Sequence, residues 1–403
     1  MKAPAPILFI VFTVTLDAMG VGLIMPVMPE LIREIRGTSI SDAALWGGLM
    51  SFTYAAMQFL FGPLLGNLSD RYGRRPVLII SLFFMGLDYL LLALAPTLFL
   101  FFIARLISGI TGATYSTAFA YLADISNKGQ RASNFGMVGA AFGIGFVIGP
   151  AVGGLLGELG LRMPFFVAAG FAFANALFGY FVLPETLPPE KRRTFELKRA
   201  NPFSALLNLR HLPFVGGLMF VTLLSSIANQ VYPSIWSYFT IERFGWSLST
   251  VGISLAVYGI SSAVMQVWAL RIMIERYGER KTAIAGMIIT VISLIAMTFI
   301  EHGWIVFIGM PIVALGEVVR PAIQGMMADQ SNDSEQGELQ GVFSSVIAIA
   351  SIISPLLMTF IFRTFTKETA AFYQPGAPFA AAALLSIIAL VVFIRQGRSS
   401  TEK

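Results

Sequence analysis

Residues 62–76 read Gly62-Pro-Leu-Leu-Gly66-Asn-Leu-Ser-Asp70-Arg71-Tyr-Gly73-Arg74-Arg75-Pro76. This short polar stretch joins two long apolar ones, 43–66 and 76–95. Its glycines allow two helices to approach and the chain to turn tightly, and Asp70 can pair with Arg74, or with Asp124 through a shared arginine. The pattern predicts a charged loop between two membrane helices, whose ion pairs favour one conformation and release it when they break. Plain anchoring at the cytoplasmic surface is the alternative role for its arginines.

The composition excludes an ordinary soluble protein. Only 12% of the 403 residues are charged, 56% are hydrophobic and the mean hydropathy is +0.77, whereas about a quarter of a soluble globular domain is charged. The chain has no cysteine and two histidines, His211 and His302. It therefore offers no thiolate or histidine-rich metal site and no constellation for nucleophile-plus-imidazole catalysis. We expect no enzyme activity, no resident metal and no cofactor.

Twelve apolar stretches follow one another along the chain, and each is long enough for one bilayer-spanning helix of about 20 residues. They run at 7–28, 43–66, 76–95, 97–123, 134–157, 163–184, 212–240, 249–272, 281–300, 303–328, 338–363 and 375–395. The longest polar segment divides them six and six. The sequence therefore predicts an all-α integral membrane protein with a six-helix bundle at 1–190, a cytoplasmic linker at 191–211 and a second six-helix bundle at 212–403.

The two halves of the chain repeat each other. Several short motifs recur 205 residues later: Ser69–Arg75 as Ile274–Arg280, Ala123–Asn127 as Ala328–Asn332, Gly136 as Gly341 and Pro150 as Pro355. Matches at one fixed offset indicate parallel repeats with a pseudo-two-fold axis. Many secondary transporters are built in this way, with the substrate site at the repeat interface near the bilayer midplane.

The basic residues are distributed unevenly about the predicted helices. If both termini are cytoplasmic, 19 of the 27 Lys and Arg residues lie on the inside, 6 lie outside and 2 lie within helices. This excess obeys the positive-inside rule and predicts the orientation. The net charge of +5 is therefore explained by topology, and nucleic-acid binding is not indicated.

Ionisable residues inside membrane helices are costly and usually face a cavity or a partner. Those of this chain are Asp17, Asp88, Arg105, Glu317 and Arg320. A carboxylate beside an arginine in a low dielectric can couple proton loading to substrate arrival. We therefore predict proton-coupling roles for Asp17, Asp88, Arg105 and Glu317. The alternatives are a structural ion pair between Arg105 and an acid of the first or third helix, and mutual neutralisation of Glu317 and Arg320 at i,i+3.

Uncharged polar side chains within helices are the candidates for positioning a polar ligand. We predict a substrate path that involves Gln58, Asn229, Gln230, Gln266, Arg320 and Gln324. Helix-to-helix hydrogen bonding is the alternative role for each of them, as it is for Asn175.

The fifth apolar stretch carries a run of small residues and one proline: Gly136, Gly145, Gly149, Pro150, Gly153 and Gly154. Small residues at this spacing make a smooth face for close helix packing, and the proline bends the helix and frees a carbonyl. A tight helix crossing is the minimum that this pattern predicts.

Both motifs also carry a resemblance to a known family. Residues 62–76, with Asp124, resemble the signature loop of the major facilitator superfamily, and the glycine run resembles the antiporter signature of its drug-exporting members. Nearly the whole chain is similar to the tetracycline/proton antiporters of the twelve-helix drug exporter group. The stretches that carry this similarity are residues 13–29, Met57–Phe59, Asp88–Tyr89, Arg105–Ala113, Pro164–Phe166 and Leu339–Gly341.

The resemblance implies the major facilitator fold and a bacterial inner-membrane protein that works by alternating access. In that family a divalent-metal chelate of the drug leaves in exchange for protons, so the proton gradient supplies the energy and the metal arrives with the substrate. Carried over, Asp17 and Asp88 are acids of the transport path, Gln58 lies near the path, and Arg105 belongs to the buried charge network. The resemblance also leads us to expect a functional monomer.

The sequence departs from this family in the second half. The family has an acid in the ninth helix after a Gly-Met-Ile stretch, where this chain has Ile289 and Thr290, and a histidine in the eighth helix, where Ser261 and Ser262 now stand. Our hypothesis is that Glu317 replaces the absent acid. Two other functions stay open: transport of a sugar, metabolite or other drug, and a membrane receptor that does not transport.

Overall fold

The computed structural model describes residues 5–112, 114–127, 130–195, 201–203, 216–329 and 336–399. Most of the predicted linker 191–211 lies outside these ranges, as do His211 and the first residues of the predicted second bundle. Within the described ranges the structure is helical and contains no strand. The all-α prediction is confirmed.

The helices of the first half lie close to the predicted stretches. Their bounds are α1 Ala5–Arg36, α2 Ile40–Tyr72, α3 Arg74–Leu94, α4 Leu98–Thr111, α5 Thr114–Ile125, α6 Arg131–Leu159, α7 Met163–Val182 and the short 3-10 turn η1 Pro189–Lys191. However, the predicted stretch 97–123 is divided into α4 and α5, and α1 continues to Arg36, beyond its predicted end at 28.

The second half has more interruptions. Its elements are α9 Gly216–Asn229, α10 Val231–Phe244, α11 Leu248–Val264, the π-helical η4 Met265–Ala269, α12 Leu270–Phe299, α13 Gly303–Ala314, the 3-10 turn η5 Leu315–Val318, α14 Val319–Ala328, α15 Gln336–Thr366 and α16 Ala377–Ser399.

The described helices account for twelve membrane passes. Ten helical spans are long and apolar enough to cross a bilayer, and one of them, Leu248–Phe299, has 52 residues. A single pass needs about 20 residues, and Gly278 interrupts this long span with non-helical backbone. The span therefore provides two passes, and α4 with α5 provides another.

The turn between the second and third passes is repeated between the eighth and ninth. Gly73 ends the first turn with φ 108°, and Gly278, 205 residues later, has φ 74°. L-residues with a side chain rarely adopt positive φ, so both turns require glycine. The internal repeat read from the sequence is thus present in the backbone.

The chain forms two compact units, and each contains a segment from the other half of the sequence. The first unit comprises residues 1–38, 53–202 and 247–256; the second comprises 39–52, 203–246 and 257–403. Residues 40–52 at the start of α2 therefore belong to the second unit, and residues 248–256 at the start of α11 belong to the first.

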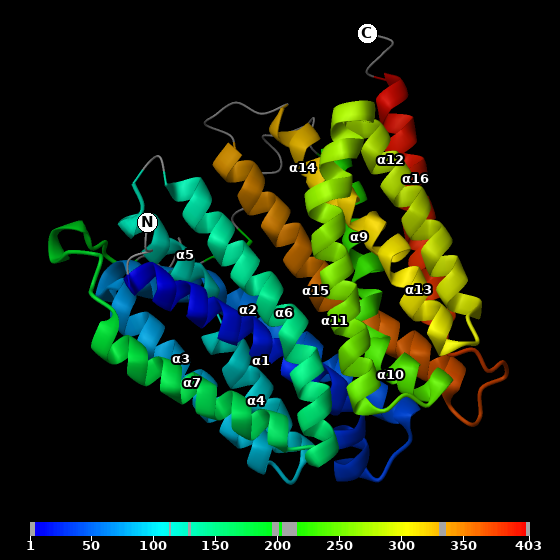
Figure 1. Ribbon diagram of the computed structural model, residues 1–403, viewed down its shortest axis with the longest axis horizontal. Helices are drawn as coiled ribbons and strands as arrows, with labels where there is room; N and C mark the ends of the chain where they lie inside the picture. The colour runs from blue at the N-terminus through cyan, green and yellow to red at the C-terminus, as the bar shows by residue number, and fades with distance from the viewer. Residues whose placement is uncertain are drawn as a thin grey trace. The chain divides into compact units, whose positions relative to one another are not determined.

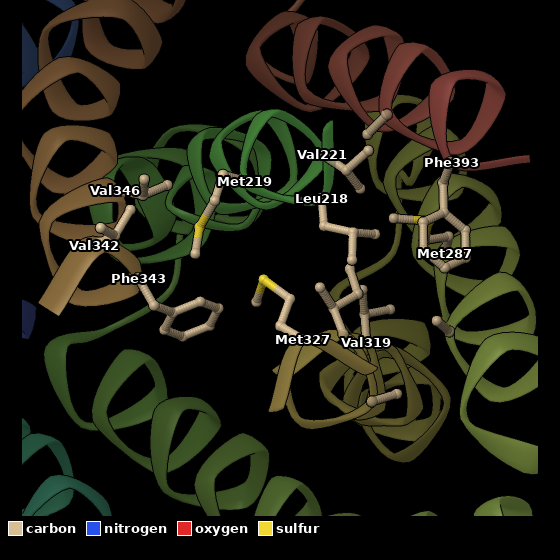
Figure 2. Close-up of a cluster of buried hydrophobic side chains, with 14 of the residues drawn as sticks. Leu218, Met219, Val221, Met287, Val319, Met327, Val342, Phe343, Val346 and Phe393 are labelled. Atoms are coloured by element: carbon tan, nitrogen blue, oxygen red, sulfur yellow. The ribbon is translucent and has the colours of Figure 1, made fainter. Parts of the chain in front are cut away.

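In the first unit, the main packing joins α1 with α6 and α3 with α7, and Figure 1 shows each pair running side by side. In the second unit, a buried apolar cluster gathers side chains of α9, α12, α14, α15 and α16. Figure 2 shows Met219, Met327 and Phe343 of this cluster turned toward one another. Flexible methionines suit such a core because they fill irregular gaps between helices.

Candidate functional site

A buried ion pair lies at the centre of the first unit. The carboxylate of Asp88 on α3 is buried, and its Oδ2 lies 3.3 Å from Nη2 of Arg105 on α4. The other carboxylate oxygen and Nε of Arg105 are buried without a hydrogen-bond partner among the described residues. A buried pair with unsatisfied polar atoms is costly to keep. Such groups cluster where charge or ligand has to be exchanged.

The neighbours of this pair come from α2. The guanidinium of Arg105 lies over the ring of Tyr54, 5.8 Å from its centroid. The amide of Gln58 donates to the Tyr54 hydroxyl at 3.3 Å and to the carbonyl of Gly112 at 3.2 Å. Gly112 ends α4, so Gln58 binds the backbone at the point where the fourth pass is interrupted. The sequence placed Gln58 and Arg105 in one region, and the structure brings them to the same tyrosine.

Asp17 joins this group from α1. It is half-buried and forms no hydrogen bond or ion pair with the residues whose side chains are described. Electrostatic interactions link it, with Asp88 and Arg105, to Tyr54. One turn further along α1, Gly20 lies directly against the Tyr89 hydroxyl, where a β-carbon would overlap it. The first unit thus assembles a paired carboxylate and an unpaired one around tyrosines.

The predicted charged loop is almost entirely helical, because Asp70 and Arg71 lie at the end of α2 and Arg74 begins α3, but its charges form the predicted cluster. Nη1 of Arg74 lies 2.6 Å from Oδ1 of Asp70, and Nε of the same arginine lies 3.3 Å from Oδ2 of Asp124 on α5. Arg74 also donates to the Ser69 hydroxyl. One arginine thus bridges two acids on different helices, as the sequence suggested. Arg71 lies apart from this cluster, over the ring of Tyr72.

Glu185 contacts the charged cluster, although the sequence did not single it out. Its carboxylate accepts hydrogen bonds from the backbone N–H groups of Arg74 at 3.0 Å and Arg75 at 3.3 Å, at the start of α3. A β-carbon on Gly73 would overlap this carboxylate. Unpaired N–H groups and the helix dipole make a helix start favourable for an anion. The sequence feature that could have identified Glu185 is its position just after the sixth apolar stretch, on the same predicted side of the membrane as these arginines.

The glycines of α6 have two packing faces. A β-carbon on Gly145, Gly149 or Gly153 would overlap a backbone carbonyl of α1. Gly154 instead lies against the carbonyl of Leu248, and the Pro150 carbonyl lies against Gly252 of α11. The backbone of Ser249 donates to the Glu158 carboxylate at 3.1 Å. The pattern predicted as a tight crossing thus holds α6 to α1 and to the start of α11 within the first unit.

Three glycines of the predicted motifs have no such role in this structure. A β-carbon on Gly62, Gly66 or Gly136 would have no neighbouring atom within 4 Å. The expectation that Gly62 and Gly66 bring two helices together is therefore not met. Their spacing of four residues places both on one face of α2, and that face carries no close contact at these two positions.

The second unit has its own carboxylate site at Glu317. This residue lies in η5, where the Tyr258 hydroxyl donates to its Oε1 at 2.7 Å. Nη2 of Arg320 lies 3.9 Å from its other oxygen. The ring of Tyr232 stacks on that of Tyr258 with centroids 6.1 Å apart. Thr290, where the sequence lacks the expected acid, lies directly against Gly316, next to Glu317.

The polar residues of the predicted substrate path bind different partners. Gln230 donates to the Ser351 hydroxyl at 2.9 Å and Gln324 to the side chain of Gln340 at 2.7 Å, both on α15. Gln266 is exposed and contacts Ser262, and Asn229 is half-buried at the end of α9. Among the described residues, each of the three glutamines therefore bonds its own serine or glutamine partner and none bonds another member of the predicted path.

In the first unit, the amide of Asn175 donates to Thr13 at 3.0 Å and joins α7 to α1. Across the residues that the structure describes, no three His, Asp or Glu side chains gather as they would around a metal ion.

Comparison with known proteins gives consistent matches over the whole chain. A sequence model of the Major Facilitator Superfamily matches residues 10–226 and again residues 218–403. The class C tetracycline resistance protein of Escherichia coli is 41% identical over 90% of this chain and 91% of its own length. The class G tetracycline resistance protein of Vibrio anguillarum is 40% identical over 87% of this chain and 88% of its own.

Among solved structures, a bacterial homologue of the human lysosomal transporter Spinster superposes with a TM-score of 0.79. The superposition covers 99% of this chain and 98% of that one, at 16% sequence identity. At this identity the match establishes the fold.

Proposed function

The chain belongs to the Major Facilitator Superfamily, and on that premise we propose that it is a proton-coupled antiporter that exports tetracycline-like drugs by alternating access. The observation that carries the proposal is the group of Asp17, Asp88 and Arg105 in a chain 41% identical to a tetracycline resistance protein. The substrate leaves as a chelate with a divalent metal. The proton gradient supplies the energy, and the protein needs no resident metal or cofactor and performs no catalysis.

The chain acts as a monomer in a bacterial inner membrane. Both termini face the cytoplasm, because this orientation places 19 of the 27 basic residues on the inside. Its partners are the small-molecule substrate, protons and the lipid bilayer, and no nucleic acid.

The two acids of the first unit have different tasks. Asp88 is neutralised by Arg105, so it stays charged while that pair is intact. Asp17 has no hydrogen-bond or ion-pair partner among the described side chains, so it can take up a proton or meet a cationic group of the substrate while the pair of Asp88 and Arg105 is intact. A substrate that draws Arg105 away from Asp88 leaves a buried charge unpaired. Proton uptake by Asp88 then relieves that cost, which ties substrate arrival to proton binding.

Arg74 controls the exchange between conformations. It bridges Asp70 on α2 and Asp124 on α5, while Glu185 caps α3 beside it. These contacts are partly solvent-exposed and each is worth about 1 kcal/mol or less. They therefore bias a conformational equilibrium without preventing the transition.

Glu317 serves as the proton site of the second unit. It lies beside Thr290 and Gly316, where the ninth helix of this chain lacks the acid of the resembling family. The Glu317→Gln variant tests this role directly, because it keeps the size of the side chain and removes its charge. Wild-type proton coupling in that variant would contradict it.

The experiment that tests the whole proposal uses an efflux-deficient bacterial strain that expresses the chain. We expect tetracycline resistance that is lost in Asp17→Asn, with equal amounts of both proteins in the membrane fraction. Inverted membrane vesicles should release protons when tetracycline and Mg²⁺ are added together. Resistance that is unchanged in Asp17→Asn, or drug uptake without proton release, would overturn the proposal. Glu190→Gln is the matched control, because this acid in η1 is exposed.

A further inference from the structure

We propose that Tyr258 is a positioning residue for Glu317 and sets the pH range in which the transporter works. The proposal rests on the proposed function, in which Glu317 binds a proton. The hydroxyl of Tyr258 on α11 donates to Oε1 of Glu317 at 2.7 Å. The two residues are separated by 59 positions in the chain, so this bond joins the eighth pass to the interrupted tenth pass.

The ring of Tyr258 is held in place by other aromatic side chains. Tyr232 stacks on it with an interplanar angle of 21°. Tyr232 in turn contacts Trp236 at 5.9 Å and Phe379 at 5.5 Å between ring centroids. Aromatic contacts of this kind fix the orientation of a ring at little entropic cost. The ring is therefore already oriented so that the Tyr258 hydroxyl can donate to the carboxylate.

Arg320 cannot hold the carboxylate in this way. Its nearest nitrogen is 3.9 Å from Oε2 of Glu317, and its side chain is 57% exposed against 21% for the glutamate. An exposed ion pair at that distance contributes little, because water screens both charges. The shorter and better shielded contact is the hydrogen bond from Tyr258, so this bond determines where the Glu317 carboxylate lies.

The first unit has a related arrangement at the same position of the repeat. Gly112 and Glu317 are 205 residues apart, which is the repeat offset, and both lie where a pass is interrupted. At Gly112 the backbone carbonyl accepts from Gln58, and the Tyr54 hydroxyl lies alongside. In the first unit a tyrosine of the second pass thus lies at the break in the fourth pass. In the second unit a tyrosine of the eighth pass lies at the break in the tenth pass. The second unit adds a carboxylate at that break.

Few other titratable groups face Glu317. Those in electrostatic contact with this site are Tyr258, Tyr232 and Arg320. The elements η4 and α13, which also pack against η5, carry no charged residue. The charged residues of α12 all lie between Arg271 and Lys281, at the other end of that helix from Thr290.

Tyr258 therefore controls proton binding by Glu317 through one bond. A hydrogen bond donated to a carboxylate favours its charged form. Removing the hydroxyl should therefore move the pH at which transport is half-maximal upward by about one unit or more.

The test compares Tyr258→Phe with wild type in inverted vesicles, with tetracycline uptake measured over a series of pH values. Each profile is scaled to its own maximum, so the comparison does not depend on protein yield. We expect a shift of about one pH unit to higher pH and an unchanged KM for tetracycline. Glu317→Asp withdraws the carboxylate by one methylene and should shift the profile in the same direction.

The chain offers a matched control at Tyr373, between α15 and α16. Its hydroxyl also donates to a glutamate, Glu242, at 2.7 Å, but at an exposed site. Burial and the bond to Glu242 raise the pKa of Tyr373 to about 12, so it remains a donor throughout the assay. Tyr373→Phe should leave the pH profile at the wild-type position.

A wild-type pH profile in Tyr258→Phe would overturn the inference and leave the proposed function standing. Failure of the proposed function looks different, because the wild-type vesicles themselves would then show no exchange of tetracycline for protons.

Discussion

Nε of Arg363 lies 2.6 Å from Oδ1 of Asp42, although 321 positions separate the two residues in the chain. Asp42 is in the first turn of α2 and Arg363 in the last turn of α15. Each charge is favourable at its own helix end, because the helix dipole is positive at the start and negative at the end. The hydroxyls of Ser41 and Thr366 are bonded beside the pair. Within the second unit, these contacts join a segment of the N-terminal half to the C-terminal half.

Alternating access moves one repeat against the other, so a covalent link between Asp42 and Arg363, which belong to different sequence repeats, should stop transport. The chain has no cysteine of its own, so the double variant Asp42→Cys, Arg363→Cys needs no prior engineering. We expect a short thiol-reactive cross-linker, cleavable by reduction, to abolish tetracycline uptake in vesicles, and dithiothreitol to restore it. The two single-cysteine variants, treated identically, are the controls. Full transport by the cross-linked protein would show that this contact persists throughout the transport cycle.

Removing Arg105 alone should cost more stability than removing the pair. Arg105→Ala leaves the buried Asp88 carboxylate without its counter-ion, a loss of about 3–5 kcal/mol. The double variant Arg105→Ala, Asp88→Asn should recover most of the thermal stability in detergent, measured by intrinsic fluorescence, and remain inactive in transport. Equal melting temperatures for the single and double variants would contradict the importance of this ion pair for folding.

A methyl group on Gly149 should separate α6 from α1. Its β-carbon would overlap the Met19 carbonyl, and backbone atoms cannot move aside as a flexible side chain can. We expect Gly149→Ala to reduce transport at least tenfold, about 1.4 kcal/mol in rate. Gly143→Ala is the control on the same helix, because Gly143 is exposed and no atom lies within 4 Å of its added carbon. Similar uptake rates for the two variants would contradict the close approach.

Neutralising Glu185 should weaken the start of α3. Its carboxylate accepts from two backbone N–H groups there, and loss of a helix cap typically costs about 1 kcal/mol. We expect Glu185→Gln to be less stable than wild type by about that amount and to bring trypsin cleavage after Arg74 forward in time, since Pro76 protects the bond after Arg75. Glu190→Gln again serves as the control. A wild-type cleavage rate would show that the carboxylate charge does not matter to this cap.

Much of the fold could be predicted because hydrophobic length and repeated motifs are local signals. The turn at Gly73 and its repeat at Gly278 were visible as matching sequences, and both have the positive φ that glycine permits. The bridge from Arg74 to Asp70 and Asp124 also followed from residue types, since few acids lie near the arginines.

The finer contacts could not be predicted, since they depend on how helices rotate about their axes. Sequence spacing left the partner of Arg105 open between the first and third helices, and the structure selects Asp88. The sequence identified Glu317 but not Tyr258, because an aromatic residue in a membrane helix is usually interpreted as a packing or interface residue. At Gly62 and Gly66 the sequence suggested a close helix contact that the structure lacks, because glycine spacing alone does not reveal which helix faces meet.

The glycines of α6 that pack against α1 and α11 also limit which amino-acid substitutions this protein can tolerate. No amino acid is smaller than glycine, so every missense change at Gly145, Gly149, Gly153 or Gly154 adds atoms where a carbonyl already lies. Selection for resistance to a new drug can therefore act on the side chains that surround this helix but not on these four positions. In a library of single substitutions we expect these codons to tolerate only synonymous changes, while neighbouring exposed positions such as Gly143 accept many residues.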